Sequence, residues 1–474
     1  MSRSSLRLSL AAMLAATLTP AVDAQTPSEQ LVETGAYVAR AADCMSCHIA
    51  PDGTPYAGGK FIETPLGDIM ATNITPSDTH GIGRYSEADF TAVLREGKAP
   101  DRMLYPAMPY PSYHGVSDDD IQALFAYMQT VDPVDRAPDG ETNLDFPFNM
   151  RFLMRVWNAI AIEDDGRGET ADAEIERGAY LVDHLGHCGT CHTPRNAMMM
   201  SDDSRYLGGT MVQGWEAPNI TSDPVSGLGN WSDEDIVQYL KTGRAMGTTQ
   251  AAGPMAEVVH FSTRYMQNDD LMAMARYLKT VPALTSENQS RPVTLPIAER
   301  PELPPHQYNS IREELAAALV KADLTSGQSL YLTQCAACHG VNGEGQSAAY
   351  YPALIGNADL RRDNMANLVN VIALGSGHAT LYRAPKMPGF SRDLDDGQIA
   401  EIANYARVEF GGVAESDLSA SDVNALLNPE PDLSFLIKYA GVLAWLGILI
   451  ALVLVGALIW WIVRRNRNSV EGSA

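Results

Sequence analysis

All six cysteines of the chain fall in three copies of one motif, Cys-x-x-Cys-His, at residues 44–48, 188–192 and 335–339. On a helix, residues i, i+3 and i+4 share a face, so each copy presents two thiols and an imidazole to one flat partner. This is the arrangement of covalent haem c attachment, in which two thioethers hold the porphyrin and the histidine binds iron. We therefore predict three covalently bound haem c groups, attached at Cys44, Cys47, Cys188, Cys191, Cys335 and Cys338, with His48, His192 and His339 as iron ligands.

Other uses of a cysteine pair fit the pattern less well. A lone Cys-x-x-Cys could be a thioredoxin-like redox pair or half of a zinc site. A redox pair does not need a following histidine, and a zinc site would need its remaining ligands nearby. Three copies that all carry the histidine, with no cysteine left over, favour haem.

Methionines beside prolines recur at a nearly constant distance after a glycine that ends a predicted helix. The distance is 11 residues in the first copy and 12 in the other two. Proline disfavours helix and indicates a stiff loop, from which a thioether can reach the open side of iron. The predicted second iron ligands are Met108, Met255 and Met387, counted from Gly97, Gly243 and Gly375. The histidines His114, His260 and His378 are the alternative ligands.

Helical periodicity around the motifs predicts an all-α fold. Each motif is preceded by a helix with a glycine and a tyrosine, and each unit closes with a helix that holds an aromatic residue, at 117–131, 269–281 and 395–410. A glycine that faces an aromatic residue lets two helices cross closely. The first two units also share an Asn-Ile-Thr loop, at 73–75 and 219–221, which we interpret as structural because the offset of 146 residues is constant there.

The spacing of the motifs predicts three tandem cytochrome c domains, at 25–135, 168–285 and 318–414, called here the first, second and third units. Linkers are expected at 136–167, 286–317 and 415–435, and the prolines of 286–317 predict an extended strap. The first linker contains an apolar cluster with two arginines at 146–157. This cluster is either buried between units or in contact with a partner or the membrane surface.

The two ends of the chain predict export and a membrane anchor. Residues 1–24 have the charged start, apolar run and small-residue cleavage site of a secretory signal peptide. Residues 436–463 are expected to form one transmembrane helix, followed by a basic tail at 464–474. Because basic flanks stay in the cytoplasm, the three units are expected on the periplasmic side of a bacterial inner membrane, with the C-terminus in the cytoplasm.

The charge of the chain argues against one class of partner. With 34 basic and 58 acidic residues the net charge is -24, so nucleic acid is not an expected partner. The acidity is interpreted as a well-solvated surface, and the alternative is a docking face for a basic protein.

Several longer motifs together resemble one family. They are the Asn-Ile-Thr-x5-Gly-x-Gly loops, the Tyr-Pro-Ala-Met-Pro-Tyr-Pro run at 105–111, the Gly-His-Cys-Gly-Thr-Cys-His-Thr-Pro run at 186–194, the Tyr-Tyr-Pro-Ala-Leu run at 350–354 and the C-terminal anchor. The chain resembles the triheme cytochrome c subunit of bacterial membrane-bound dehydrogenases that oxidise alcohols, aldehydes, gluconate, fructose or sorbitol. The stretch at 215–221 is more similar to members that serve flavin or molybdenum enzymes than to those that serve quinoprotein alcohol dehydrogenase.

The resemblance implies an electron-transfer role. A separate catalytic dehydrogenase subunit with flavin, molybdenum or PQQ, with or without a third small subunit, would oxidise the substrate, and electrons would pass through three haems to ubiquinone. The sequence agrees, because it has no nucleotide-binding glycine fingerprint and no catalytic triad signature. The alternatives are a cytochrome c subunit of a terminal oxidase and a free-standing anchored electron carrier.

Overall fold

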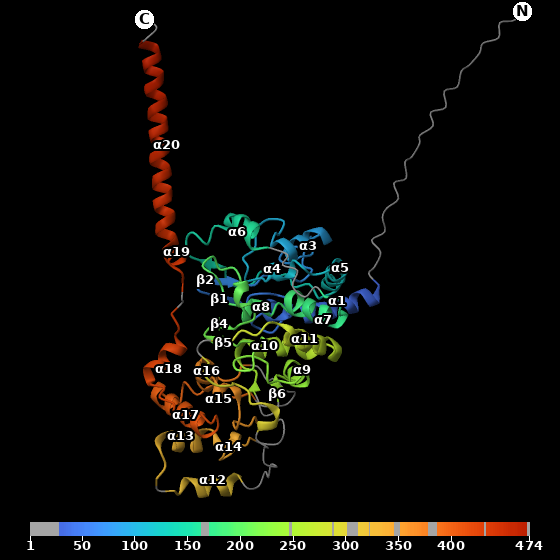
Figure 1. Cartoon of the computed structure of the whole chain (residues 1–474). Coiled ribbons are helices and arrows are strands. Elements are labelled where there is room, and N and C mark those ends of the chain that lie inside the picture. The colour runs from blue at the N-terminus through green and yellow to red at the C-terminus, as the bar shows by residue number, and fades with distance from the viewer. Residues whose placement is uncertain are drawn as a thin grey trace, which may run out of the picture.

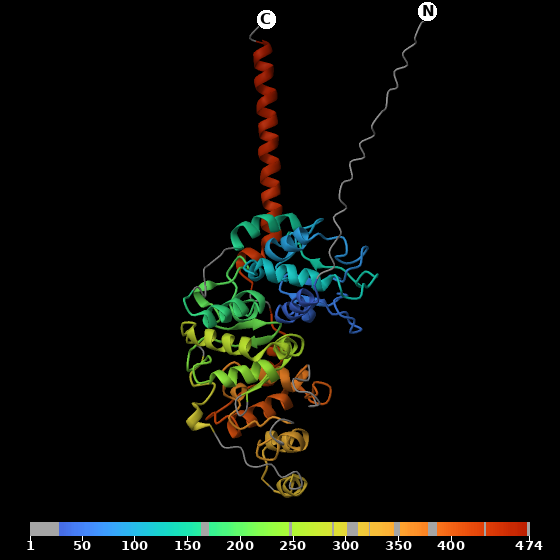
Figure 2. The same ribbon diagram turned by 90° about the vertical axis from the view of Figure 1, so that its right-hand side faces the viewer.

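The computed structural model describes residues 28–162, 170–245, 249–286, 289–300, 311–321, 323–345, 351–377, 386–430 and 433–471. The predicted signal peptide, the alternative ligand His378 and the end of the tail after residue 471 lie outside these residues. The three units form an elongated stack, in which the first unit lies nearest the C-terminal helix and the third lies farthest from it (Figures 1 and 2).

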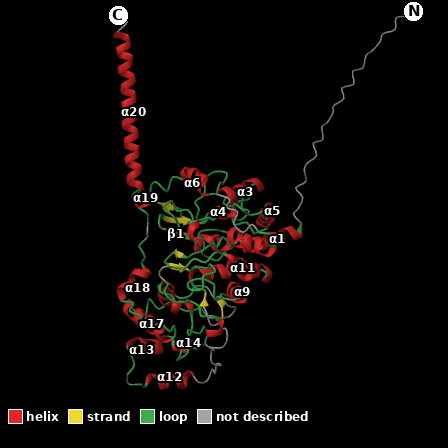
Figure 3. Ribbon diagram, in the orientation of Figure 1, coloured by secondary structure: helices red, strands yellow, loops and turns green. Residues whose placement is uncertain are grey.

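Helices dominate every unit (Figure 3). The first unit contains α1 Glu29–Ala41, α2 Cys44–His48, α3 Glu87–Glu96, α4 Tyr110–Tyr113 and α5 Asp118–Met128. The second contains α7 Ala173–Ala179, η2 Tyr180–Leu185, α8 Gly189–His192, η3 Asp203–Arg205, α9 Asp233–Thr242, α10 Gly253–Phe261, η4 Thr263–Tyr265 and α11 Asn268–Thr280. The third contains α13 Ser326–Gln334, α14 Ala336–His339, α15 Ala358–Arg361, α16 Ala366–Leu374 and α17 Asp396–Glu409.

One crossing of two helices recurs in all three units, between α1 and α5, α7 and α11, and α13 and α17. A glycine stands at each crossing, as the sequence predicts. A Cβ atom on Gly35, Gly178 or Gly327 would lie 1.9, 2.1 or 2.4 Å from a carbonyl oxygen of the opposite helix. No larger side chain fits there, so the glycines set how closely the helix before each motif approaches the helix that closes the unit.

The fold is not purely helical, since short antiparallel strands join the loops around the motifs. In the first sheet β1 Phe61–Thr64 pairs with β2 Gly67–Met70, which pairs with β3 Asn143–Leu144. The second unit adds β4 Thr210–Val212 with β5 Trp215–Ala217, and β6 Arg244–Ala245 with β7 Thr249–Gln250. Strands of two to four residues are too short to show alternation in a sequence, so periodicity did not predict them.

The predicted linkers also contain ordered elements. The first carries β3, η1 Arg151–Leu153 and α6 Met154–Ala161, and the strap carries η5 Ile297–Glu299 and the start of α12 Ile311–Leu319. The segment 415–435 contains α18 Ala420–Leu427, which packs on α16 and α17 with Val423 fully buried. This segment therefore extends the core of the third unit before the chain returns along the stack to α19 Phe435–Lys438 (Figure 1).

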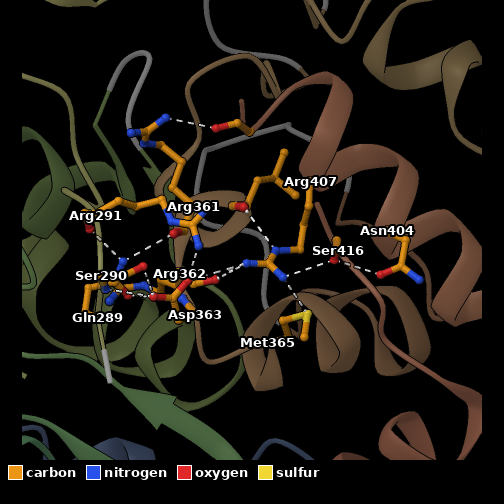
Figure 4. Close-up of polar contacts among 12 residues, drawn as sticks. Gln289, Ser290, Arg291, Arg361, Arg362, Asp363, Met365, Asn404, Arg407 and Ser416 are labelled. Carbon is orange, nitrogen blue, oxygen red and sulfur yellow. Dashed lines mark hydrogen bonds and ion pairs between the residues drawn. The ribbon is translucent and has the colours of Figure 1, made fainter. Parts of the chain in front are cut away.

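The strap is fixed to the third unit by a polar cluster (Figure 4). Ser290 donates from its backbone and from its hydroxyl to the Asp363 carboxylate, both at 2.8 Å, and Arg291 forms an ion pair with the same carboxylate. Arg361 in turn donates to the backbone oxygen of Pro292 at 3.1 Å. These contacts hold the strap against the third unit.

The C-terminal helix α20 spans Ala440–Glu471, and its segment Ala440–Ile462 is 23 residues long with a mean hydropathy of 2.9. At ~1.5 Å per residue this segment reaches ~35 Å, enough to cross a hydrocarbon core of ~30 Å. The helix begins later than the sequence predicts, because the chain turns at Tyr439 between α19 and α20. The described part of the chain thus has one helix with the length and composition to span a membrane.

The hydrophobic core is divided unevenly among the units. One continuous apolar cluster joins the first and second units, from Val38 and Leu124 to Leu181 and Leu271. The third unit has a separate cluster around Tyr331, Val369 and Ile402.

Candidate haem sites

The three motifs adopt the helical turn that the sequence predicts. Motif 44–48 forms α2, whereas the other two place their first cysteine as the N-terminal cap of α8 or α14. Burial raises the pKa of Cys44, Cys47, Cys188 and Cys335 to about 12. Thiols with such pKa values are poor nucleophiles at neutral pH, which disfavours a thioredoxin-like redox pair.

Each motif histidine is held by a backbone carbonyl in the same way. The Nδ1 atoms of His48, His192 and His339 lie 2.6, 2.7 and 2.9 Å from a carbonyl oxygen. A carbonyl can only accept, so Nδ1 carries the hydrogen and Nε2 keeps a free lone pair for a metal. Burial also lowers the pKa of all three imidazoles, which keeps them neutral, as ligation requires. The accepting carbonyls belong to Thr72, Pro218 and Pro352.

The predicted methionines occupy different local structures. Met387 lies in a loop, where its backbone nitrogen donates to the Ser376 hydroxyl at 3.0 Å. Met108 precedes α4 and packs on the core of the first two units. Met255 lies in the first turn of α10, directly after Pro254, and not in a stiff loop as predicted. Proline is tolerated at the start of a helix, so its presence there did not exclude helix.

The alternative ligands that the structure describes have other contacts. The Nδ1 atom of His114 lies 3.1 Å from the carbonyl oxygen of Arg95. The ring of His260 packs edge-on against Phe261, with 4.6 Å between the ring centroids.

A cavity of about 480 Å³ connects the second and third sites. Its wall includes the motif residues Cys188, Cys191, His192, Cys335, Cys338 and His339, together with Met255 and Met387. Apolar side chains such as Leu228, Trp231 and Phe390 form much of the remaining wall. Paired thiols, a neutral imidazole with a free nitrogen and an apolar space fit a covalently attached haem. Two sites that share one space would also bring their haems close together.

Two arginines that line this cavity each act on the motif histidine of the neighbouring unit. Arg362 belongs to the third unit, yet its charge adds to burial in lowering the pKa of His192 in the second. Arg244 belongs to the second unit and acts in the same way on His339 of the third. Both line the cavity, and Arg362 is anchored by Asp359, which accepts from Thr249 across the junction at 3.0 Å. No sequence pattern predicts these contacts, because they arise from packing between units.

The first two units meet through a reciprocal pair of tyrosines. The Tyr37 hydroxyl donates to Asp270 at 2.5 Å, and the Tyr180 hydroxyl donates to Asp120 at 2.6 Å. The Tyr37 hydroxyl also accepts from the backbone nitrogen of Gln267, and the Tyr180 hydroxyl accepts from that of Ser117, both at 3.2 Å. Each unit therefore donates a hydrogen bond from an equivalent tyrosine to an aspartate in the first turn of the other unit's closing helix.

The helical turn, the neutral imidazole and the apolar pocket define a c-type cytochrome. A family model described as cytochrome c matches residues 32–132, and one described as cytochrome C oxidase, cbb3-type, subunit III matches residues 322–405. Cytochrome c domains carry covalently bound haem c, which agrees with the chemistry of the motif residues.

Relatives match nearly the whole chain. The fructose dehydrogenase cytochrome subunit of Gluconobacter japonicus is 40% identical, over 95% of this chain and 93% of the relative. The cytochrome c subunit of alcohol dehydrogenase (quinone) from Gluconacetobacter polyoxogenes is 40% identical over 85% and 86%. The gluconate 2-dehydrogenase cytochrome c subunit of Pantoea cypripedii is 38% identical over 85% and 91%. The chain belongs to this family of dehydrogenase cytochrome c subunits, and its role is electron transfer.

Proposed function

We propose that the chain binds three haem c groups and carries electrons from a catalytic dehydrogenase subunit to ubiquinone in the membrane. The observation that carries the proposal is the threefold recurrence of one ligand geometry, a motif histidine whose Nδ1 atom meets a carbonyl within 2.9 Å. A structural role for the motifs would not require the same tautomer at all three histidines. When bound, haem iron supplies the one-electron redox change.

The cysteines of each motif hold the porphyrin, and its histidine is the first iron ligand. The second ligands are Met108, Met255 and Met387, of which the last two share the cavity wall with His192 and His339. Each unit, at 25–135, 168–285 and 318–414, then forms one cytochrome c domain.

The stack of units provides a path for electrons. The shared cavity supports direct exchange between the second and third haems. At the other junction the ring of His187, directly before Cys188, packs against Tyr113 with 5.5 Å between ring centroids, and the Tyr113 hydroxyl donates to the carbonyl oxygen of Ala42, two residues before Cys44, at 2.6 Å, which supports a short distance between the first two sites. Since the first unit lies on the side of α20 (Figure 1), we assign the ubiquinone end of the path to it and the dehydrogenase end to the third unit.

Helix α20 anchors the subunit in the bacterial inner membrane. Its C-terminal flank carries Arg464, Arg465 and Arg467, which favours the cytoplasmic side for residues 464–474 and the periplasmic side for the three units. A signal peptide at 1–24 would deliver them there. The names of the relatives support a catalytic dehydrogenase partner, and a small third subunit completes the complex in our proposal.

The haem count tests this proposal. The pyridine haemochrome assay on purified protein should give three haems c per chain, all resistant to extraction by acid acetone. A value near one, or extractable haem, would contradict it.

Truncation before residue 433 should preserve transfer to ferricyanide and abolish transfer to long-chain ubiquinone in membranes. Full activity of the truncated protein with that quinone would argue against the proposed acceptor.

The second candidate is a cytochrome c subunit of a terminal oxidase, favoured by the oxidase family model that matches residues 322–405. That match covers the third unit, whereas the dehydrogenase subunits match the chain over most of its length. Copurification discriminates between the two functions. A large dehydrogenase subunit in the purified complex supports the first, and an oxidase core subunit supports the second.

A further inference from the structure

The first linker exposes an apolar stripe. The side chains of Phe152, Val156 and Ile160 are spaced four residues apart, so in η1 and α6 they lie on one face. Phe152, Val156 and Ile160 are 61%, 64% and 45% exposed, although their side chains are large and apolar. Contiguous exposed apolar side chains mark a surface that another molecule or a membrane covers.

The opposite face of α6 is bound to the body of the protein. Buried Asn158 accepts from the Tyr110 hydroxyl and donates to the carbonyl oxygen of Glu96, both at 2.7 Å. The indole of Trp157 donates to the carbonyl oxygen of Met198 at 2.9 Å. These contacts fix the rotation of α6, so the stripe is a permanent surface feature and not a face that waits to fold inward.

The position of α6 indicates what covers the stripe. Helix α6 lies at the base of α20 in both views, on the side of the stack toward which α20 extends (Figures 1 and 2). The linker also touches α20 directly, with 5.4 Å between the ring centroids of Phe146 and Trp445. Since Trp445 lies inside the apolar segment Ala440–Ile462, the linker reaches the level at which that segment begins.

The charge of the segment that carries the stripe suits a lipid surface. Residues 146–162 contain Arg151 and Arg155 and no acidic residue, in a chain with a net charge of -24. Arg155 is exposed beside the stripe. An apolar face flanked by arginine is typical of helices that lie at the boundary between lipid headgroups and acyl chains, where phosphates attract the cation.

We propose that Phe152, Val156 and Ile160 insert into the periplasmic surface of the bilayer that α20 crosses, as a second membrane attachment. The inference rests on the proposed function, which places α20 in the membrane. A single helix leaves the haem units free to swing about its base. A second contact beside it holds the first unit against the bilayer that contains quinone.

Photocrosslinking to lipid tests this attachment in the full-length, haem-loaded protein. The protein is reconstituted in vesicles of phosphatidylethanolamine and phosphatidylglycerol that include a phospholipid with a photoreactive acyl chain. After irradiation, mass spectrometry locates the modified peptides. We expect lipid adducts on two regions, residues 152–160 and the apolar part of α20. Adducts on α20 without adducts on 152–160 would overturn the second attachment and leave the anchor intact, whereas no adducts on either would overturn the anchor itself.

A charge-insertion pair provides the matched control. Val156→Glu should abolish the adducts on 152–160 and keep those on α20. Val320→Glu changes a valine that is 81% exposed at the far end of the stack, after α12, and should change neither. The haemochrome spectrum verifies that both variants retain their haems. If adducts on 152–160 disappear whenever the dehydrogenase subunit is bound, the stripe belongs to that protein and the proposal is wrong.

Discussion

The two junctions of the stack are built on different principles. The first and second units share one hydrophobic cluster and exchange equivalent tyrosines, Tyr37 and Tyr180, in a nearly symmetric way. The second and third units have separate cores, meet around a cavity of about 480 Å³ and are joined by polar contacts of the strap. The first junction is therefore suited to rigid placement of two sites. The second leaves space for cofactors and places charges where they can adjust their potentials.

Loss of an axial methionine should have the largest effect, and it tests the ligand assignment at the second junction with the first unit for comparison. Met387→Ala removes the thioether that we predict on the third iron, and axial ligands set haem potentials over a range of about 0.8 V. Redox titration should show one haem at a much lower potential and loss of its thioether charge-transfer band. Met108→Ala should affect one other haem in the same way. Met103→Ala, in the loop before Met108, serves as the control, and a large shift there instead would refute the ligand assignment.

Substitution of the crossing glycines should show whether the cores unfold separately. A Cβ atom at Gly178 or Gly327 would overlap a carbonyl oxygen, and overpacking of this kind costs about 1–3 kcal/mol. Gly178→Ala should lower a calorimetric transition common to the first two units, because these share one core. Gly327→Ala should lower a different transition, that of the third unit. A single transition that responds equally to both changes would contradict the difference between the junctions.

His187 makes the first junction sensitive to acid. Its ring packs edge-on against Tyr113, 5.5 Å between centroids, and burial lowers its pKa to about 4. Below about pH 6.5 the unfolded chain binds a proton at this histidine and the folded junction does not, so stability falls as the pH drops from 6.5 toward 4, whereas above pH 6.5 the histidine is neutral in both states. The loss at pH 4.5 should be about 2–3 kcal/mol.

Denaturant unfolding of wild type and His187→Gln, each at pH 7.5 and pH 4.5, isolates this contribution. The comparison is needed because the pKa of nearby buried Asp43 is raised to about 8, chiefly by burial, which gives stability the opposite slope with pH. The difference in unfolding free energy between the two proteins should shrink at the lower pH. An unchanged difference would mean that His187 is not held neutral at the junction.

The sequence predicted the local chemistry of the sites better than their surroundings. The motif turns and the crossing glycines follow from spacing along one helix, and the structure has both. The carbonyls that orient the histidines could not be identified in advance, because they lie 13 to 26 residues further along loops without periodicity. Pro218 and Pro352 do fall in runs that carried the family resemblance, which was the available signal. The assignment of haem to the three motifs, and of Met255 as an iron ligand from its position in α10, stays a prediction.

Removal of the arginines that reach across the second junction should give the smallest effect. It tests whether a charge on one unit adjusts the haem potential of the other. Arg362 and Arg244 each place a cation near the histidine of the other unit, where a positive charge disfavours the oxidised iron. At an effective dielectric constant of about 20 and a separation of about 10 Å, such a charge contributes about 1–2 kcal/mol. For one electron this is roughly 40–90 mV.

Arg362→Gln should therefore lower the potential of the second haem, and Arg244→Gln that of the third, by tens of millivolts on this estimate. Spectroelectrochemical titration should be combined with Met255→Ala or Met387→Ala, which mark the two haems by their lost charge-transfer bands. Arg177→Gln is the matched control, because Arg177 is paired with Asp270 at 2.8 Å at the first junction and does not line the cavity between the second and third sites. If each arginine shifted the haem of its own unit instead, the charges would act within units, and the second junction would not tune its haems by exchange.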